Sequence, residues 1–129
     1  MFDTNVYVSA LVIPGSLAEK AILRVLEGKD QAFISKEILD ELLKVLARKF
    51  SRDAGELARV ALWISDCTHL VRPKRRFHVL KDDADNRILE CASEAKVDAI
   101  VTGDKEMLAL GEFEGIRIVS LREYLMLEE

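Results

Sequence analysis

The sequence predicts an α/β fold in which a parallel sheet is covered by helices on both faces. Strand-like segments alternate with helical ones along the chain, and the strand-like segments are continuous apolar runs, as in sheets buried on both sides. Half of the 129 residues are hydrophobic and a third are charged, which is typical of a globular domain with a substantial core. We expect residues 1–129 to form a single domain.

The amino-terminal half is expected to begin with a strand, because Phe2–Val8 is apolar and strand-like. A turn at Ile13–Ser16 then leads into a helix, since Ser16 suits an N-cap and Gly28 suits the residue after a helix. The next expected elements are, in order, a buried strand at Ala32–Ile34, a helix capped by Ser35, a helix from about Asp53 to Ile64, and a strand at Thr68–Val71.

A basic, irregular stretch, Arg72–Lys81, precedes the carboxyl-terminal half, where Asp82 and Asp83 open another helix. The remaining expected elements are a buried strand at Asp98–Thr102, a short helix around Asp104–Leu110, a loop between Gly111 and Gly115, a strand at Ile116–Val119 and a helix at Leu121–Leu127. In open α/β sheets, ligands bind at the carboxyl ends of the strands. Polar side chains at those ends are therefore the first candidates for a site.

Composition leaves the class of ligand open. The net charge is −4 and the pI is about 5.3, whereas a nucleic-acid binder is usually basic. A bound cation would offset the negative charge of acids gathered around it, so the net negative charge does not exclude a nucleic-acid binder. Cys67 and Cys91 are expected to be buried thiols. The apolar run Val6–Ile13 is too short to span a bilayer, and we expect a cytoplasmic protein with no targeting segment and no membrane contact.

Two acidic residues are candidates because of their place in the expected fold. Asp3 lies inside the first apolar segment, where an unpaired carboxylate is costly, and Asp-Thr-Asn places three polar side chains together. Asp104 follows a buried strand across Thr102 and Gly103, at the carboxyl end of that strand. Asp104 is equally suited to cap the next helix, and Thr102 and Asp104 can serve both purposes.

Two further acids are candidates on weaker grounds. Glu41 lies at the border of the apolar face of its helix, and periodicity alone places it equally well on the solvated side. Asp82, Asp83 and Asp85 cluster at a helix start, where the helix dipole favours acids. Of these three, Asp85 with Asn86 lies nearest the apolar face of the helix.

The chemistry of four gathered carboxylates points to divalent metal. They would repel one another without cations, and hard oxygen ligands select Mg²⁺ or Mn²⁺ rather than zinc. Two such ions about 4 Å apart would clamp the attacking and leaving oxygens of a phosphodiester. The residues therefore favour a metal-dependent nuclease.

Four motifs, taken in order, resemble the PIN domain family, and more closely its prokaryotic VapC-like members, the toxin ribonucleases of toxin–antitoxin systems. The first motif is Asp3-Thr4-Asn5-Val6, and the second is Ser35 with Glu41-Leu42. The third consists of Asp82, Asp85-Asn86, Leu89 and Ala92. The fourth is Val101-Thr102-Gly103-Asp104-Lys105. The resemblance extends over nearly the whole chain. Only Met1 and Phe2 precede the first motif, so we expect either that the first strand, which is central in the family, is short, or that the true start lies upstream of this chain.

The resemblance implies a three-layer α/β/α sandwich with a mostly parallel central sheet, and cleavage of RNA with Mg²⁺ or Mn²⁺. It also implies a cognate antitoxin as partner and a homodimer. The positions that match the family's catalytic and metal-binding acids are Asp3, Glu41, Asp85 and Asp104, and those that match its supporting polar positions are Asn5, Thr102 and Asn86.

The expected RNA-binding surface is a basic cluster beside Phe77, made of Arg72, Lys74, Arg75 and Arg76. Basic residues with an aromatic suit a phosphate backbone and a stacked base, although the same residues would also suit a solvated loop. The alternative to a nuclease is a catalytically silent PIN-like module that binds RNA or protein. Acid-dependent Mn²⁺ binding separates the two.

Overall fold

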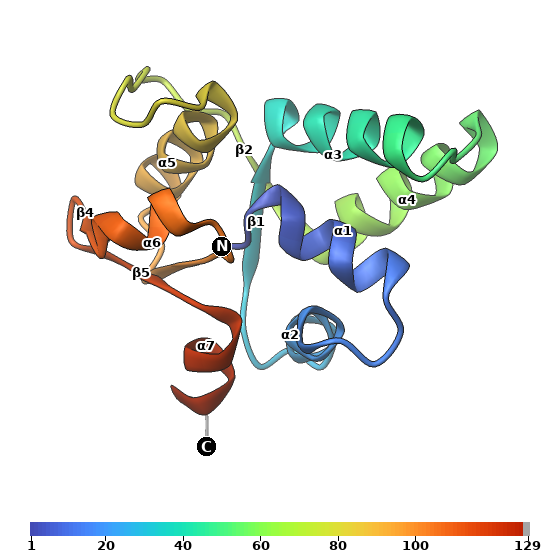
Figure 1. The fold of residues 1–129 in the computed structure, drawn as a ribbon, viewed down its shortest axis with the longest axis horizontal. Coiled ribbons are helices and arrows are strands. Elements are labelled where there is room, and N and C mark those ends of the chain that lie inside the picture. The colour runs from blue at the N-terminus through green and yellow to red at the C-terminus, as the bar shows by residue number, and fades with distance from the viewer. Residues whose placement is uncertain (128–129) are drawn as a thin grey trace.

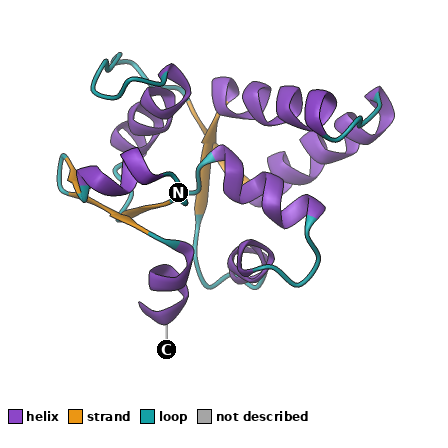
Figure 2. Ribbon diagram, viewed as in Figure 1, coloured by secondary structure: helices purple, strands orange, loops and turns teal. Residues whose placement is uncertain are grey.

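The computed structural model describes residues 1–127, which contain seven helices and five short strands (Figures 1 and 2). In order along the chain they are α1 (Thr4–Val12), α2 (Leu17–Leu26), β1 (Ala32–Ser35), α3 (Lys36–Lys49), α4 (Ala54–Cys67), β2 (Thr68–Val71), α5 (Asp83–Ala95), β3 (Ala99–Val101), α6 (Lys105–Leu110), β4 (Glu112–Phe113), β5 (Ile116–Val119) and α7 (Leu121–Leu127). The α/β class predicted from the sequence is confirmed.

The strands lie in two sheets within the described residues. In one, β1 pairs in parallel with β2, from Ala32 opposite Thr68 to Ser35 opposite Val71. In the other, β5 is central, with β3 parallel on one side and β4 antiparallel on the other. Phe2 forms a single parallel bridge with Val101 of β3. The predicted parallel pairing is present, but it does not run through one continuous central sheet.

The strand predicted at Phe2–Val8 is wrong beyond Phe2, because α1 begins at Thr4. The side chain of Asp3 accepts a hydrogen bond from the N–H of Val6 and so caps the helix. Val6 and the two residues after it are all buried, and a short run of consecutive buried apolar residues has no periodicity that separates a helix from a buried strand. No single helix in residues 1–127 is long and apolar enough to cross a membrane; α1 and α2 pass that test only as a pair bent by 100°.

The strand β4 occupies part of the loop that the sequence predicts between Gly111 and Gly115. It forms a tight hairpin with β5, and the two turn residues, Glu114 and Gly115, have φ of +50° and +82°. Positive φ at both central residues is what the favoured two-residue hairpin turn requires. Glutamate is an uncommon residue in such a turn, so the sequence signal was weak.

The other elements agree with the sequence to within a few residues, because their ends carry local signals. Ser16 and Ser35 cap α2 and α3, and Asp53 with Glu56 forms a capping box at the start of α4. Both predicted thiols are free, but only Cys91 is fully buried. The helix α1 packs on α2 and α3, and α3 and α5 both contact β1. These contacts bring the starts of α1 and α5 close to α3.

Candidate active site

Asp3 lies where the bridge at Phe2 ends and α1 begins, and only 4% of its surface is exposed. The Val6 N–H donates to its Oδ1 at 3.0 Å, and the Thr102 hydroxyl donates to its Oδ2. Its own N–H donates to the Val101 carbonyl at 3.1 Å. Burial raises the pKa of Asp3, and the charge of Asp104 adds to this, although the hydrogen bonds from Thr102 and Val6 act the other way. The carboxylate is thus held rigidly in a place that disfavours its charge.

Thr102 connects Asp3 to the end of β3. Its side chain is fully buried, its hydroxyl accepts from the Asp104 N–H at 3.0 Å, and its own N–H donates to the Val119 carbonyl at 3.0 Å. The Oδ2 of Asp104 accepts from the Met107 N–H at 2.9 Å, so Asp104 caps α6, as one of the two sequence interpretations predicts. Asp3 and Asp104 therefore meet at the same edge of the sheet, across Thr102.

Asp85 is the half-buried acid of the cluster at the start of α5. Asp82 is the N-cap and its Oδ1 accepts from the Ala84 N–H at 2.9 Å, while Asp83 is exposed. Burial raises the pKa of Asp85 to about 7, and the charges of Asp104, Asp82, Asp3 and Glu106 contribute, in that order. Asp85 therefore lies within electrostatic range of both Asp3 and Asp104. Its role as a ligand stays a prediction.

Glu41 is half-buried on α3 and lines a neighbouring cavity of about 310 Å³. The other residues around this cavity come from the starts of α1 and α5 and from α3 itself, namely Thr4, Glu37, Ile38, Asp40, Lys44, Asp83, Ala84 and Arg87. Glu41 is absent from the described charges that raise the pKa of Asp85. The structure thus brings the three aspartates together and leaves Glu41 across an adjacent cavity.

The donor chemistry of this edge fits a hard divalent cation. Within residues 1–127, no three His, Cys, Asp or Glu side chains are arranged closely enough to hold a metal ion as they stand. The three aspartates nevertheless offer only oxygen ligands, which Mg²⁺ and Mn²⁺ prefer. Nor do Asp3, Asp85 and Asp104 form an ion pair in the described part of the chain. Their mutual repulsion is therefore not relieved by an ion pair with a described residue.

The two asparagines that the sequence predicts as supporting residues act in different ways. Asn86 is buried, its amide oxygen accepts from the N–H groups of Val79 and Leu80 at 3.1 and 2.8 Å, and its amide nitrogen donates to the Leu80 carbonyl at 2.8 Å. Asn5 is exposed, and its backbone N–H lowers the pKa of Asp3. Asn86 thus fastens the loop before α5, and Asn5 supports Asp3 through its main chain.

Two members of the predicted RNA-binding cluster contact acids of the same chain. Arg75 contacts Glu114 at 2.8 Å and the Ser93 hydroxyl at 2.5 Å, and its guanidinium lies 5.0 Å from the centre of the Phe77 ring. Arg76 pairs with two glutamates, Glu37 at 3.0 Å and Glu90 at 3.2 Å. Arg72 and Lys74 are exposed. Binding of RNA by this cluster stays a prediction.

Sequence reasoning missed three residues that shape this region. Lys44 and Arg87 bring positive charge to the cavity beside Glu41, and the buried Glu90 holds the basic loop against α5. A signal existed for the first two. Lys44 lies three residues after Glu41, and Arg87 lies four residues after Asp83, so each pair shares a helix face. Nothing local separates Glu90 from a solvated helix acid.

Comparison with known proteins identifies the family. The family model that matches this chain is that of the PIN domain, over residues 1–106, which include all four predicted acids. An uncharacterized protein of Methanocaldococcus jannaschii is 30% identical over 114 residues, which cover 85% of this chain and 73% of that protein.

Proposed function

Because the chain belongs to the PIN domain family, we propose that it is a Mg²⁺- or Mn²⁺-dependent endoribonuclease that acts as the toxin of a toxin–antitoxin pair. PIN domains are generally nucleases that use divalent metals and bind RNA. The observation that carries the proposal is the group of three interacting aspartates, Asp3, Asp85 and Asp104, with no ion-pair partner among the described residues. A carboxylate cluster of this kind would be stabilised by a bound cation.

In this proposal Asp3, Asp85 and Asp104 hold the cation, and Glu41 completes the site from α3. When bound, Mg²⁺ or Mn²⁺ supplies Lewis-acid stabilisation of the phosphate oxygens and an activated nucleophile. The Val6 N–H and the Thr102 hydroxyl fix the orientation of the Asp3 carboxylate. Burial and the neighbouring acids raise the pKa of Asp85 to about 7, so a bound cation would compete with a proton for this carboxylate near neutral pH. Hydrolysis would leave a 5′-phosphate and a 3′-hydroxyl.

The RNA is proposed to lie across the cavity that Glu41 lines, next to the three aspartates. Lys44 and Arg87 line this cavity and offer positive charge to the phosphate backbone. The remaining partners, a cognate antitoxin and a second copy of the chain, are supported by the exposed apolar side chains of Leu23, Leu26 and Met126. We also propose a cytoplasmic location.

The decisive experiment compares the wild type with Asp3→Asn and Asp104→Asn on single-stranded RNA with Mn²⁺, and repeats each assay with EDTA. Asparagine keeps the helix-capping acceptor and removes the charge, so folding is preserved. We expect cleavage to fall at least about 100-fold in both variants and to stop with EDTA, because cation binding stabilises charge in the transition state. Asp53→Asn, at the exposed cap of α4, is the matched control and keeps full activity.

Equal cleavage by the wild type and both aspartate variants would exclude the proposed site.

Two further arms of the same assay test the substrate surface and the partner. Lys44→Ala is expected to raise KM with little change in kcat, whereas Lys49→Ala, at the exposed end of the same helix, is expected to change neither. An antitoxin is expected to abolish cleavage. If the chain binds RNA in the absence of Mn²⁺ and does not cleave it, the result would support the alternative function, a catalytically silent RNA-binding module.

A further inference from the structure

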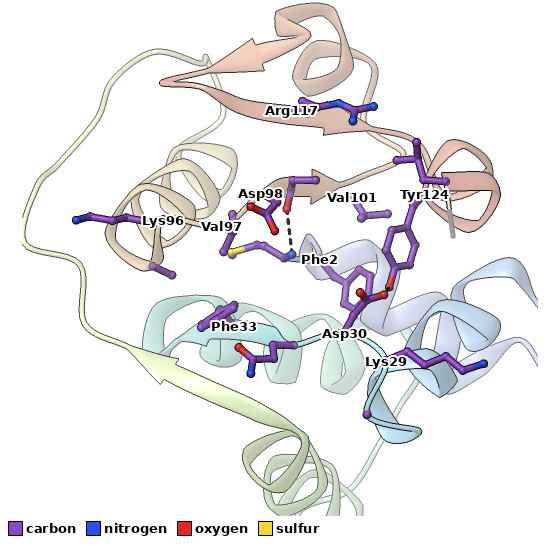
Figure 3. Close-up of a pocket in the computed structure, with 16 residues that line it drawn as sticks. Phe2, Lys29, Asp30, Phe33, Lys96, Val97, Asp98, Val101, Arg117 and Tyr124 are labelled. Carbon is purple, nitrogen blue, oxygen red and sulfur yellow. Dashed lines mark hydrogen bonds between the residues drawn. The ribbon is translucent and has the colours of Figure 1, made fainter. Parts of the chain in front are cut away.

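The cavity that Glu41 lines is surrounded mainly by charged side chains, unlike the larger cavity between the two sheets. The larger one, of about 830 Å³, is lined in part by Phe2, Phe33 and Val101 (Figure 3). Around the smaller one, of about 310 Å³, lie four acids and two bases, namely Glu37, Asp40, Glu41, Asp83, Lys44 and Arg87. A phosphate that enters the smaller cavity therefore meets more negative charge than positive.

Glu37 differs from the other three acids of this cavity because it forms an ion pair, with Arg76 of the basic loop. Its Oε2 lies 3.0 Å from Arg76 Nη1, and the two side chains are 46% and 55% exposed. The other three acids form no ion pair in the part of the chain that the structure describes. An ion pair as open to water as this one contributes little to stability, so its carboxylate is readily exchanged for another anion.

Arg76 is also held by a second acid, Glu90, and this one is buried. The same Nη1 donates to Glu90 Oε1 at 3.2 Å, and only 1% of the Glu90 side chain is exposed. Glu90 is fixed in turn by Arg87 Nη2 at 3.0 Å and by the Phe77 N–H at 2.8 Å. Arg76 would therefore stay anchored to Glu90 if Glu37 moved away. Of the two carboxylates on Arg76, Glu37 is the one that can be exchanged.

The four charged side chains Glu37, Arg76, Glu90 and Arg87 form one continuous series of ion pairs, and their charges sum to zero. The two ends of the series, Glu37 and Arg87, both line the cavity. A phosphodiester carries a single negative charge, as a carboxylate does, and arginine binds both with charge-assisted hydrogen bonds. A phosphate in place of Glu37 would thus preserve the charge balance.

We propose that Glu37 occupies, in the free protein, the position on Arg76 that a phosphate of bound RNA takes, and that it is an autoinhibitory contact at the edge of the cavity. This inference rests on the proposed function, because RNA is the anion that enters. On binding, the Glu37 carboxylate turns to water, the phosphate accepts from Arg76, and Glu90 keeps the arginine in place. RNA then binds more tightly when Glu37 loses its charge, and this gain requires Arg76.

The test measures the Kd of a fluorescently labelled single-stranded RNA by anisotropy, with EDTA present so that binding is separated from metal-dependent cleavage. We expect Glu37→Gln to lower Kd by about 3- to 5-fold, since that is the scale of an exposed ion pair. Asp40→Asn is the matched control, because Asp40 is an exposed acid of the same helix and lines the same cavity. It should change Kd by less than about 1.5-fold. Both positions are exposed, so this comparison does not depend on a variant that fails to fold.

A double variant tests the requirement for Arg76. Arg76→Gln should raise Kd by at least about 3-fold, and adding Glu37→Gln to it should give no further change. The salt dependence offers a second readout. The slope of log Kd against log salt concentration should fall by about 0.7 in Arg76→Gln, which is the contribution of one phosphate contact on a single strand. The slope should stay at the wild-type value in Glu37→Gln, because the phosphate reaches Arg76 in both proteins.

Three results would overturn the exchange. One is an equal gain in affinity from Asp40→Asn, and another is a gain from Glu37→Gln that persists without Arg76, since either would mean that Glu37 acts only by general repulsion. The third is the absence of RNA binding in the wild type and in Glu37→Gln. Cleavage with Mn²⁺ is assayed separately. If RNA binds with the expected pattern and is not cleaved, the proposed nuclease function fails and the exchange at Arg76 stands.

Discussion

Asp3 and Glu90 are both buried, with 4% and 2% of their surfaces exposed, but their carboxylates meet different partners. Glu90 pairs with Arg76 at 3.2 Å and with Arg87 at 3.0 Å, and it accepts the Phe77 N–H at 2.8 Å. Among the described residues, Asp3 accepts hydrogen bonds from neutral donors, and the charge that acts on its pKa is that of another acid, Asp104. The counter-charge of Glu90 is thus built into the chain, whereas the three aspartates have no ion-pair partner among the described residues.

This difference separates a structural acid from a candidate ligand. A buried charge is tolerated when the protein pairs it, and such a pair holds two segments in one arrangement. Glu90 does this for the loop before α5. An unpaired cluster destabilises the fold until a cation binds, and a site with that property is suited to binding.

The largest expected effect comes from removing the paired carboxylate, that of Glu90. Glu90→Gln leaves Arg87 without its carboxylate and leaves Arg76 with Glu37 alone, and we expect the free energy of unfolding to fall by about 3 kcal/mol. Urea denaturation measures it. Glu94→Gln is the matched control on the same helix, because Glu94 is exposed and accepts the Lys74 N–H, and its loss should cost less than about 1 kcal/mol. An equal loss of unfolding free energy in the two variants would show that Glu90 does not have this structural role.

The two acids also show what a sequence can and cannot predict here. Caps such as Ser16, Ser35 and Asp53 act on residues within one helical turn, so their signals are local and the helices that they begin were predicted. Asp3 was recognised as a candidate, but its partner Thr102 lies 99 residues away and no local pattern joins them. The contacts of Glu90 likewise depend on how the loop folds back on α5.

The prediction of one continuous central sheet differs from the structure for a related reason. Strand pairing depends on residues far apart in the sequence, and the apolar run after Phe2 is compatible with a buried helix as well as with a strand. The cap at Asp3 decides between them, because its carboxylate satisfies the first free N–H groups of α1. The choice of Asp85 over Asp82 and Asp83 rests on its place near the apolar face of the helix and on the family resemblance; in the structure Asp85 is half-buried and the other two are exposed.

A second prediction tests the three aspartates by adding a cation. Mn²⁺ at about 100 times its Kd should stabilise the wild type by about 2.7 kcal/mol, because it binds the folded chain only. Asp104→Asn should lose this stabilisation, and Glu90→Gln should keep it although it starts from a lower stability. Thermal denaturation with and without Mn²⁺ measures all three. Mn²⁺-dependent stabilisation that survives in Asp104→Asn would place the ion elsewhere.

The smallest expected effect comes from removing one charge of the cluster without adding a cation. With EDTA present, and at a pH above the value of about 7 to which burial and the neighbouring acids raise the pKa of Asp85, Asp85→Asn removes an ionised carboxylate that repels Asp104 and Asp3. We expect the free energy of unfolding to rise by about 0.5–1 kcal/mol, a small gain because Asp85 is partly solvated. Asp83→Asn, exposed in the same helical turn, should leave stability within about 0.5 kcal/mol of the wild type. A loss of stability in Asp85→Asn would mean that Asp85, like Glu90, already has its counter-charge in the fold.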